Sequence, residues 1–354
     1  MRGAGFPSPA STQSTTGPHS FLKYLFAFLC VLLFTAGTAL AATATNASVA
    51  TQAKPPATVK YAKGLLWKIE APGAKSNYLF GTIHSEDKRV TALPEPVIKA
   101  LDASNRFTME AIIDGEGLVH MAEAMYFNDG RTLEQVVGKK LYAESVKLLA
   151  ARGIPTLGVE KQKPWAVMMA LSMPPPKTGE YLDLILQERA TRQNKPVSGL
   201  ETIQEQLAVF DELPLPDQVA LLKEAVQEQG TFEKDLEEMI EAYLARDIAA
   251  LAEAGTKHKP DNDRLYRFVM DRLLTRRNAR MAARLGPILK DGGAFIAVGA
   301  AHLPGESGLL NLLAKAGIVS PLSTKKHCTT RRRTFLPANP KIENGAKKRR
   351  HAVP

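Results

Sequence analysis

The sequence predicts an α/β fold with a mainly parallel central sheet, flanking helices and an inserted helical subdomain. Apolar segments at residues 106–113, 195–201 and 294–298 have the length and composition of short buried strands. Long stretches with helical spacing separate them, and this alternation is typical of a parallel sheet joined by helical crossovers. The stretches 117–194 and 204–285 are longer than simple crossovers require. Part of them is therefore expected to form the inserted subdomain.

Other elements are predicted from local signals in chain order. Strand-forming residues 64–70 and 78–80 flank a turn rich in Pro, Gly, Ser and Asn, which predicts a β-hairpin. Residues 94–104 predict a short helix with proline near its start. Residues 306–316 predict a further helix, which follows the last buried strand.

The charge of the chain is unevenly distributed. Its formal net charge is +10, but residues 323–354 hold ten Lys and Arg residues against the single acidic Glu343, so the body is nearly neutral. A near-neutral body lacks the basic surface that nucleic acid requires, so we predict no nucleic-acid partner. The basic segment 323–354 is predicted to be a disordered tail. Its positive charge could make weak contact with an anionic membrane surface.

The first residues resemble a secretory leader. Lys23 precedes an apolar run at residues 24–34, and Ala39–Ala41 fits a small-residue cleavage site. We therefore predict a signal peptide over 1–41, a linker over 42–62, and export to the periplasm or the extracellular space. An uncleaved membrane anchor is the alternative. Since both cysteines lie outside residues 63–322, no disulfide is predicted in the body.

Polar residues follow four of the predicted strands. The order along the chain is strand–His84, strand–Glu110, strand–Glu201 and strand–His302. Each histidine ends a Gly-x-x-His motif, whose glycine would let the backbone turn sharply at the strand end. Because parallel strands present their carboxyl ends at one edge of the sheet, these side chains are expected to share a ligand-binding edge.

Two histidines and one carboxylate form the ligand set of many catalytic zinc sites. His84, His302 and Glu110 could hold a divalent ion such as zinc, manganese or cobalt, which would activate water for attack on a carbonyl. A purely structural role remains the alternative for each residue. A lone histidine after a strand is more often a hydrogen-bonded structural residue, Glu110 could be part of a structural ion pair, and Arg277 lies where a long helix would present a charged solvent face.

Several short motifs occur together in one order. They are Gly81–His84, Met109–Glu110, Gly199–Thr202 with Glu205–Gln206, Arg277–Asn278 and Val298–Gly305. In this combination the chain resembles the TraB/GumN family over roughly residues 64–322. The resemblance implies a fold akin to erythromycin esterase and ChaN-like proteins, and kinship with Tiki-type metalloproteases.

The resemblance also implies roles for individual residues. His84 and His302 match the motif histidines and Glu110 matches the acidic residue of the site, while Glu201, Arg277 and Asn278 match positions around it. We therefore predict an exported, peptidase-like, metal-dependent hydrolase acting on a peptide or small-molecule substrate. The alternative is a non-catalytic binding or regulatory protein on the same fold.

Overall fold

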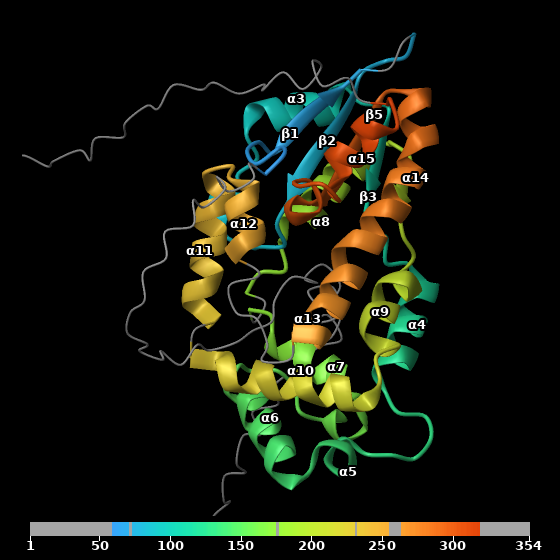
Figure 1. Cartoon of the computed structure of the whole chain (residues 1–354). Helices are drawn as coiled ribbons and strands as arrows, with labels where there is room; N and C mark the ends of the chain where they lie inside the picture. The colour runs from blue at the N-terminus through green and yellow to red at the C-terminus, as the bar shows by residue number, and fades with distance from the viewer. Residues whose placement is uncertain (1–58, 71–72, 175–176, 231, 255–262, 319–354) are drawn as a thin grey trace, which may run out of the picture.

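The computed structural model describes residues 59–70, 73–174, 177–230, 232–254 and 263–318 (Figure 1). The predicted signal peptide, most of the linker and the predicted basic tail lie outside these described residues. Within the described ranges, no helix is both long enough and apolar enough to cross a membrane.

A five-stranded sheet organises one part of the molecule. Its strand order is β1-β2-β5-β3-β4, where β1 and β2 are antiparallel and the other neighbouring pairs are parallel. The predicted hairpin and the predicted mainly parallel sheet are both confirmed. The strands are β1(Leu66–Ile69), β2(Asn77–Thr82), β3(Arg106–Met109), β4(Val197–Gly199) and β5(Ala294–Gly299).

The sequence prediction for β3 was too long, since the strand ends at Met109 rather than at Ile113. Met109 is opposite Ala297 of β5, and the ladder stops there. The next residue, Glu110, accepts the backbone N–H of Gly299 through its side-chain Oε1 at 2.6 Å. The Glu110 carboxylate therefore accepts a hydrogen bond from β5 just after β3 ends.

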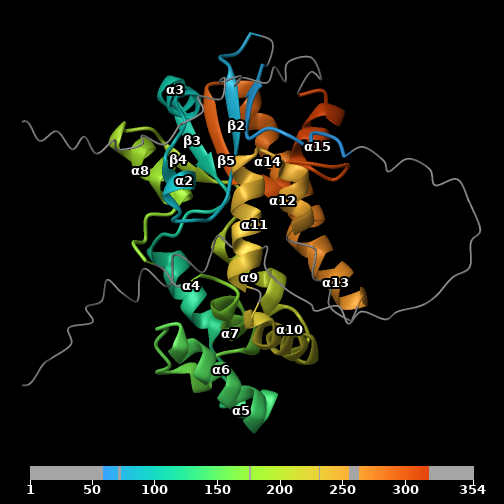
Figure 2. The ribbon, with the colours of Figure 1, turned by 90° about the vertical axis from the view of Figure 1, so that its left-hand side faces the viewer.

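Helices make up most of the remaining described chain, as predicted. Figure 2 shows α3 and α8 on one side of the sheet and α14 and α15 on the other. In chain order the α-helices are α2(Lys88–Thr91), α3(Glu95–Ala103), α4(Gly115–Met125), α5(Leu133–Val137), α6(Lys139–Ala151), α7(Pro164–Leu171), α8(Leu182–Arg192), α9(Ile203–Asp211), α10(Leu215–Gln227), α11(Phe232–Leu244), α12(Ile248–Ala254), α13(Asp263–Met270), α14(Arg277–Asp291) and α15(Leu309–Lys315). Shorter helical turns are η1(Val159–Lys161), η2(Glu228–Gly230), the π-helical η3(Asp271–Arg276) and η4(Ala300–His302).

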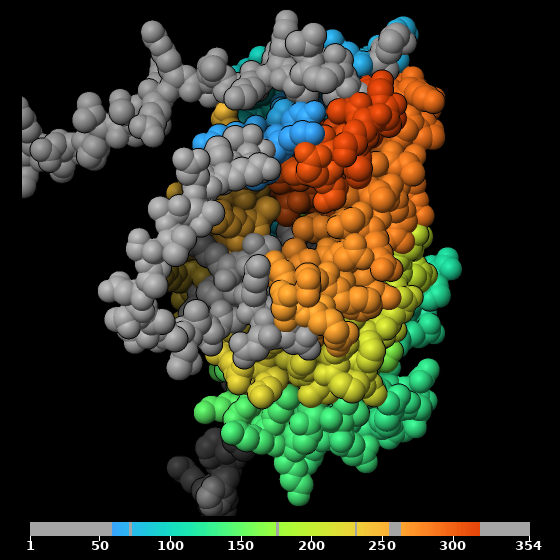
Figure 3. Space-filling view, viewed as in Figure 1, coloured from blue at the N-terminus to red at the C-terminus, as the bar shows by residue number. Residues whose placement is uncertain are grey.

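Two hydrophobic cores stabilise the fold. The first surrounds the sheet and includes Phe107, Phe295 and the buried face of α14. The second lies entirely among helices, with Trp165 and Met168 of α7 at its centre. In the space-filling view, the helices around the second core form one end of the molecule and the strands lie toward the other (Figure 3). The second core is the part of the structure that corresponds to the predicted inserted helices.

One uninterrupted helical segment contributes to both cores. The elements α13, η3 and α14 follow one another without a break, and the central turn is π-helical. A π-helical turn shifts which residues face inward, and such turns are frequent at functional sites. The segment places Arg277 and Asn278 directly after this turn, at the carboxyl edge of the sheet.

Candidate functional site at the carboxyl edge of the sheet

The four polar residues that follow the strands gather at one edge of the sheet. His84 follows β2, Glu110 follows β3, Glu201 follows β4, and His302 ends the turn η4 after β5. Because β2, β5, β3 and β4 are neighbouring parallel strands, their carboxyl ends lie side by side. The shared edge expected from the sequence is therefore present.

The motif glycines act through close packing rather than through a special turn. Neither Gly81 nor Gly299 has a positive φ. A Cβ atom on Gly81 would come within 2.8 Å of Leu303 Cδ1, and one on Gly299 within 3.1 Å of Glu110 Oε1. These glycines do not supply a left-handed backbone conformation; they leave room for Ala300 and Leu303 beside Gly81 and for the Glu110 carboxylate beside Gly299.

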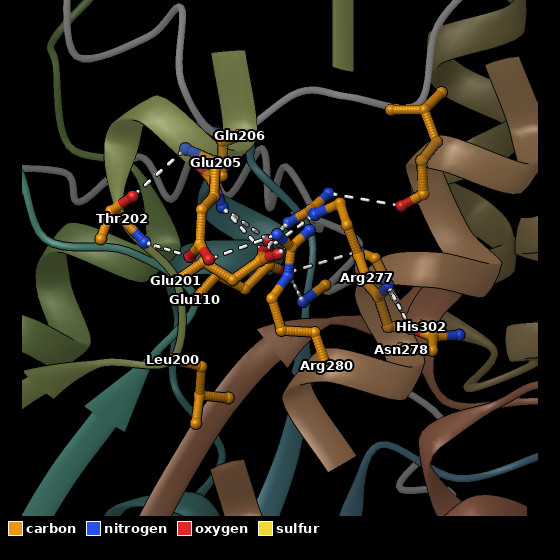
Figure 4. Close-up of polar contacts among 12 residues, drawn as sticks. Glu110, Leu200, Glu201, Thr202, Glu205, Gln206, Arg277, Asn278, Arg280 and His302 are labelled. Carbon is orange, nitrogen blue, oxygen red and sulfur yellow. Dashed lines mark hydrogen bonds and ion pairs between the residues drawn. The ribbon is translucent and has the colours of Figure 1, made fainter. Parts of the chain in front are cut away.

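Arg277 joins the two glutamates in a buried ion network (Figure 4). Its Nη2 donates to Glu110 Oε2 at 2.6 Å and to Glu201 Oε2 at 2.7 Å, and its Nε donates to the same Glu201 oxygen at 2.8 Å. The guanidinium is almost fully buried. The alternative of a solvent-facing Arg277 is therefore wrong, because the buried carboxylate of Glu201 requires a buried cation beside it.

The network keeps Glu110 ionised. Burial raises the pKa of Glu110, but the adjacent His302 and the guanidinium of Arg277 lower it more, and the pKa falls to about 2. The Gly299 N–H bond to Oε1 acts in the same direction. Glu110 is therefore a carboxylate at neutral pH, the form that binds cations or accepts protons.

His302 is held in a defined orientation by Asn278. The Nδ2 group of Asn278 donates to the carbonyl of Ser307 at 2.9 Å, so its Oδ1 faces His302 and accepts from Nδ1 at 2.6 Å. Burial lowers the pKa of His302 to about 4, more than the Glu110 carboxylate raises it. The neutral ring therefore keeps a lone pair on Nε2, which lies 3.7 Å from Glu110 Oε1.

His84 is oriented by a carboxylate and by an aromatic ring. Its Nδ1 lies 3.3 Å from Asp183 Oδ2, and its ring stacks on Tyr181 with 3.8 Å between ring centroids. Its Nε2 is buried and finds no hydrogen-bond partner among the described residues. A buried nitrogen without a partner is costly, which makes Nε2 a candidate for contact with a ligand.

A small cavity of about 60 Å³ lies at this edge of the sheet. His84, Glu110, Asp183 and Gln206 all contribute to its wall. His84, whose Nε2 has no partner among the described residues, is thus beside a space that a small group can occupy.

The donor set fits a divalent cation in its chemistry. Both histidines hold Nδ1 against an oxygen acceptor, the arrangement that leaves Nε2 to ligate a metal, and Glu110 is an ionised carboxylate. As the side chains stand, however, no group of three His, Cys, Asp or Glu residues in the described part of the chain is close enough to hold an ion.

Sequence reasoning missed the residues that position His84. Asp183 lies on α8 at the same helical spacing as the buried Leu186 and Ala190, so an acidic residue on an apolar helix face was the available signal. Tyr181 precedes this helix and carried no comparable signal for stacking. Arg280, which lies 3.4 Å from Glu201 Oε1, was also missed.

Comparison with known proteins identifies the family of the chain. A model of the TraB/PrgY/gumN family matches residues 65–321, which is most of the chain. The chain belongs to the TraB/PrgY/gumN family. The resemblance found in the motifs is thereby confirmed.

Individual relatives of this family member are distant. A metalloprotease TIKI homolog of Amphimedon queenslandica is 22% identical over 308 residues, covering 71% of this chain and 60% of its own length. The metalloprotease TIKI2 of Xenopus tropicalis is 24% identical, covering 75% of this chain and 60% of its own length. The uncharacterized protein YbaP of Shigella flexneri is 26% identical, covering 69% of this chain and 90% of its own. The chain thus spans well under two thirds of the TIKI proteins, and no solved structure matches it.

Proposed function

We propose that this TraB-family chain is a metal-dependent hydrolase that cleaves peptide bonds. The observation that carries the proposal is the pair of buried histidines at the sheet edge, each with Nδ1 held by an oxygen acceptor, beside the ionised Glu110. The relatives named as TIKI metalloproteases support it at low identity.

His84 Nε2, His302 Nε2 and Glu110 would hold the ion. A divalent cation there supplies Lewis-acid chemistry that activates water and polarises a carbonyl. In the hydrolysis, the oxygen of water joins the carbonyl carbon, the C–N bond breaks, and a proton passes to the leaving amine. Asp183 and Asn278 fix the tautomers of the two imidazoles, and Arg277 keeps Glu110 deprotonated.

A non-catalytic binding protein is the second candidate. One observation favours it: both oxygens of Glu110 are already engaged, Oε1 by the N–H of Gly299 and Oε2 by Arg277. A carboxylate in this state stabilises the fold without needing a metal. Bound metal therefore discriminates between the two candidates.

The test is elemental analysis of the full chain purified without chelators, with peptide hydrolysis measured on the same samples. We expect bound metal in the wild type and its loss in the double variant His84→Ala, His302→Ala. The control is His120→Ala, which removes a histidine with a 37% exposed side chain on α4. Equal metal content in the wild type, control and double variant would contradict the hydrolase proposal and favour the binding protein.

The proposal includes export and a family-specific fold. N-terminal sequencing of protein recovered outside the cytoplasm should give a chain that begins near Ala42. A membrane-bound chain that still begins at Met1 would favour the anchor. The kinship with erythromycin esterase and ChaN-like folds is tested by comparing an experimental structure of residues 63–322 with theirs.

A further inference from the structure

The cavity beside His84 has an apolar wall that the proposed chemistry does not use. Leu236 and Met239 of α11 and Leu251 of α12 line it, together with Pro174 and with Met109 at the end of β3. Helices α11 and α12 pack against each other, and α12 also packs against the turn η4 that ends in His302. The apolar wall therefore belongs to the same rigid surroundings as the candidate site.

The carboxylates in the cavity wall already have partners. Asp183 contacts His84 Nδ1, and Glu110 is paired with Arg277. A cationic side chain in the cavity would lose its hydration without gaining an unengaged carboxylate, and an anionic one would lie beside Glu110 and Asp183. Both arrangements are unfavourable, because burying a charge without a partner is costly.

The size of the cavity also limits which side chains can enter it. Its volume is about 60 Å³, whereas an apolar cavity of about 150 Å³ accommodates benzene. An aromatic ring would force the surrounding helices apart, and overpacking of this kind is unfavourable. A short aliphatic group can enter without that cost.

We propose that this cavity receives a small aliphatic side chain of the substrate, such as that of alanine, valine or leucine, next to the bond that is cleaved. The position follows from His84 and Glu110, which line the same cavity. This inference rests on the proposed hydrolase function for its bond cleavage. The binding preference itself can be measured without catalysis.

The experiment uses the full chain and two uncharged compounds, N-acetyl-valinamide and N-acetyl-phenylalaninamide. Their affinities are compared by ligand-observed NMR for the wild type and for Leu236→Ala, which enlarges the cavity at a half-buried position. The matched control is Leu148→Ala, a half-buried leucine of α6 that packs against the second core. Met239→Ala enlarges the same wall from a fully buried position and serves as a second variant.

We expect the wild type and Leu148→Ala to bind the valine compound about tenfold more tightly than the phenylalanine compound. In Leu236→Ala and Met239→Ala this ratio should fall toward one. Equal affinities in the wild type, no detectable binding of the valine compound, or an unchanged ratio in both enlarged variants would overturn the inference.

Hydrolysis of a peptide series that varies the same side chain separates the two proposals. A valine preference in binding without any hydrolysis would contradict the proposed function but support the pocket. Hydrolysis that is indifferent to the side chain would support the function and overturn the pocket.

Discussion

Arg277 and Glu201 form an ion pair that is shielded almost completely from solvent. The side chain of Arg277 is 1% exposed and that of Glu201 is 0% exposed, and one Glu201 oxygen accepts both Nε and Nη2. The same Nη2 reaches Glu110, so one guanidinium pairs with carboxylates from two strand ends. This pairing links the stability of the fold to the charge of the candidate site.

Removing Arg277 should therefore destabilise the protein strongly. Arg277→Ala leaves the buried Glu201 and the partly exposed Glu110 without this cation, and we expect the free energy of unfolding to fall by about 3–5 kcal/mol. Arg276→Ala is the control, since that neighbour is 61% exposed and pairs only at the surface with Asp271. It should cost about 1 kcal/mol or less. Urea denaturation measures both, and similar losses would show that the buried network is not the cause.

Gly299→Ala should disturb the site through its new methyl group. The added Cβ would lie 3.1 Å from Glu110 Oε1 and 3.4 Å from His302 Cδ2. Displacing these side chains should lower the free energy of unfolding by about 1–3 kcal/mol. Gly286→Ala is the matched control in α14, where the nearest atom is Ile318 Cδ1 at 3.7 Å.

At Gly286 the substitution should change the free energy of unfolding by about 1 kcal/mol or less, because the gain from alanine in a helix interior is opposed by its Cβ beside the following Pro287. Thermal denaturation should therefore show the larger loss of stability for Gly299→Ala. Equal shifts in both variants would argue against a steric role for Gly299.

Asp183→Asn tests the orientation of His84. The variant keeps the size of the side chain but weakens the acceptor that faces Nδ1. If the proposed metal site exists, metal affinity measured by competition with a chelator should fall about 10–100-fold. Asp129→Asn, at a side chain that is 43% exposed, provides the control. Unchanged metal affinity in Asp183→Asn would show that this carboxylate does not contribute to metal binding.

Acid stability should depend on Glu205. A hydrogen bond from Arg284 lowers the pKa of Glu205 from 4.5 to about 2, against the opposing effect of burial. The unfolded chain therefore binds more protons than the folded chain between these values. The stabilisation from this carboxylate is complete above about pH 4.5 and is lost as the pH falls toward 2.

Glu205→Gln isolates the charge, because a glutamine can still accept the N–H of Thr202 and keep the capping box of α9. The difference in unfolding free energy between wild type and variant should shrink from pH 6 to pH 3, as followed by urea denaturation. The exposed Glu144→Gln is the matched control for a Glu-to-Gln change at the surface. A difference that does not vary with pH would exclude the charge as its origin.

Local patterns predicted the elements and the edge that carries the site. The hairpin and the strand–His and strand–Glu order depend on nearby residues, and they gave the right placement of His84, Glu110 and His302. The insertion of β5 between β2 and β3 depends on long-range pairing, which no local pattern reports.

Burial of polar side chains was the weakest part of the sequence prediction. Arg277 continues the spacing of the buried Met281, Leu285 and Leu289, so the apolar face of α14 already included it. A charged residue on such a face can be read as buried only when its partners are known. Those partners, Glu110 and Glu201, come from distant strands.

The uninterrupted segment α13–η3–α14 also bears on how the protein unfolds. Leu265 and Leu273 of this segment belong to the helical core, and Met281 and Leu289 belong to the core at the sheet. Unfolding of either core would remove packing contacts from this helical segment, which also stabilises the other core. Both cores should therefore unfold in a single cooperative transition. Amide protons in α7 and in β5 should then exchange with solvent at the same opening free energy, although none of the described strands reaches the helical end.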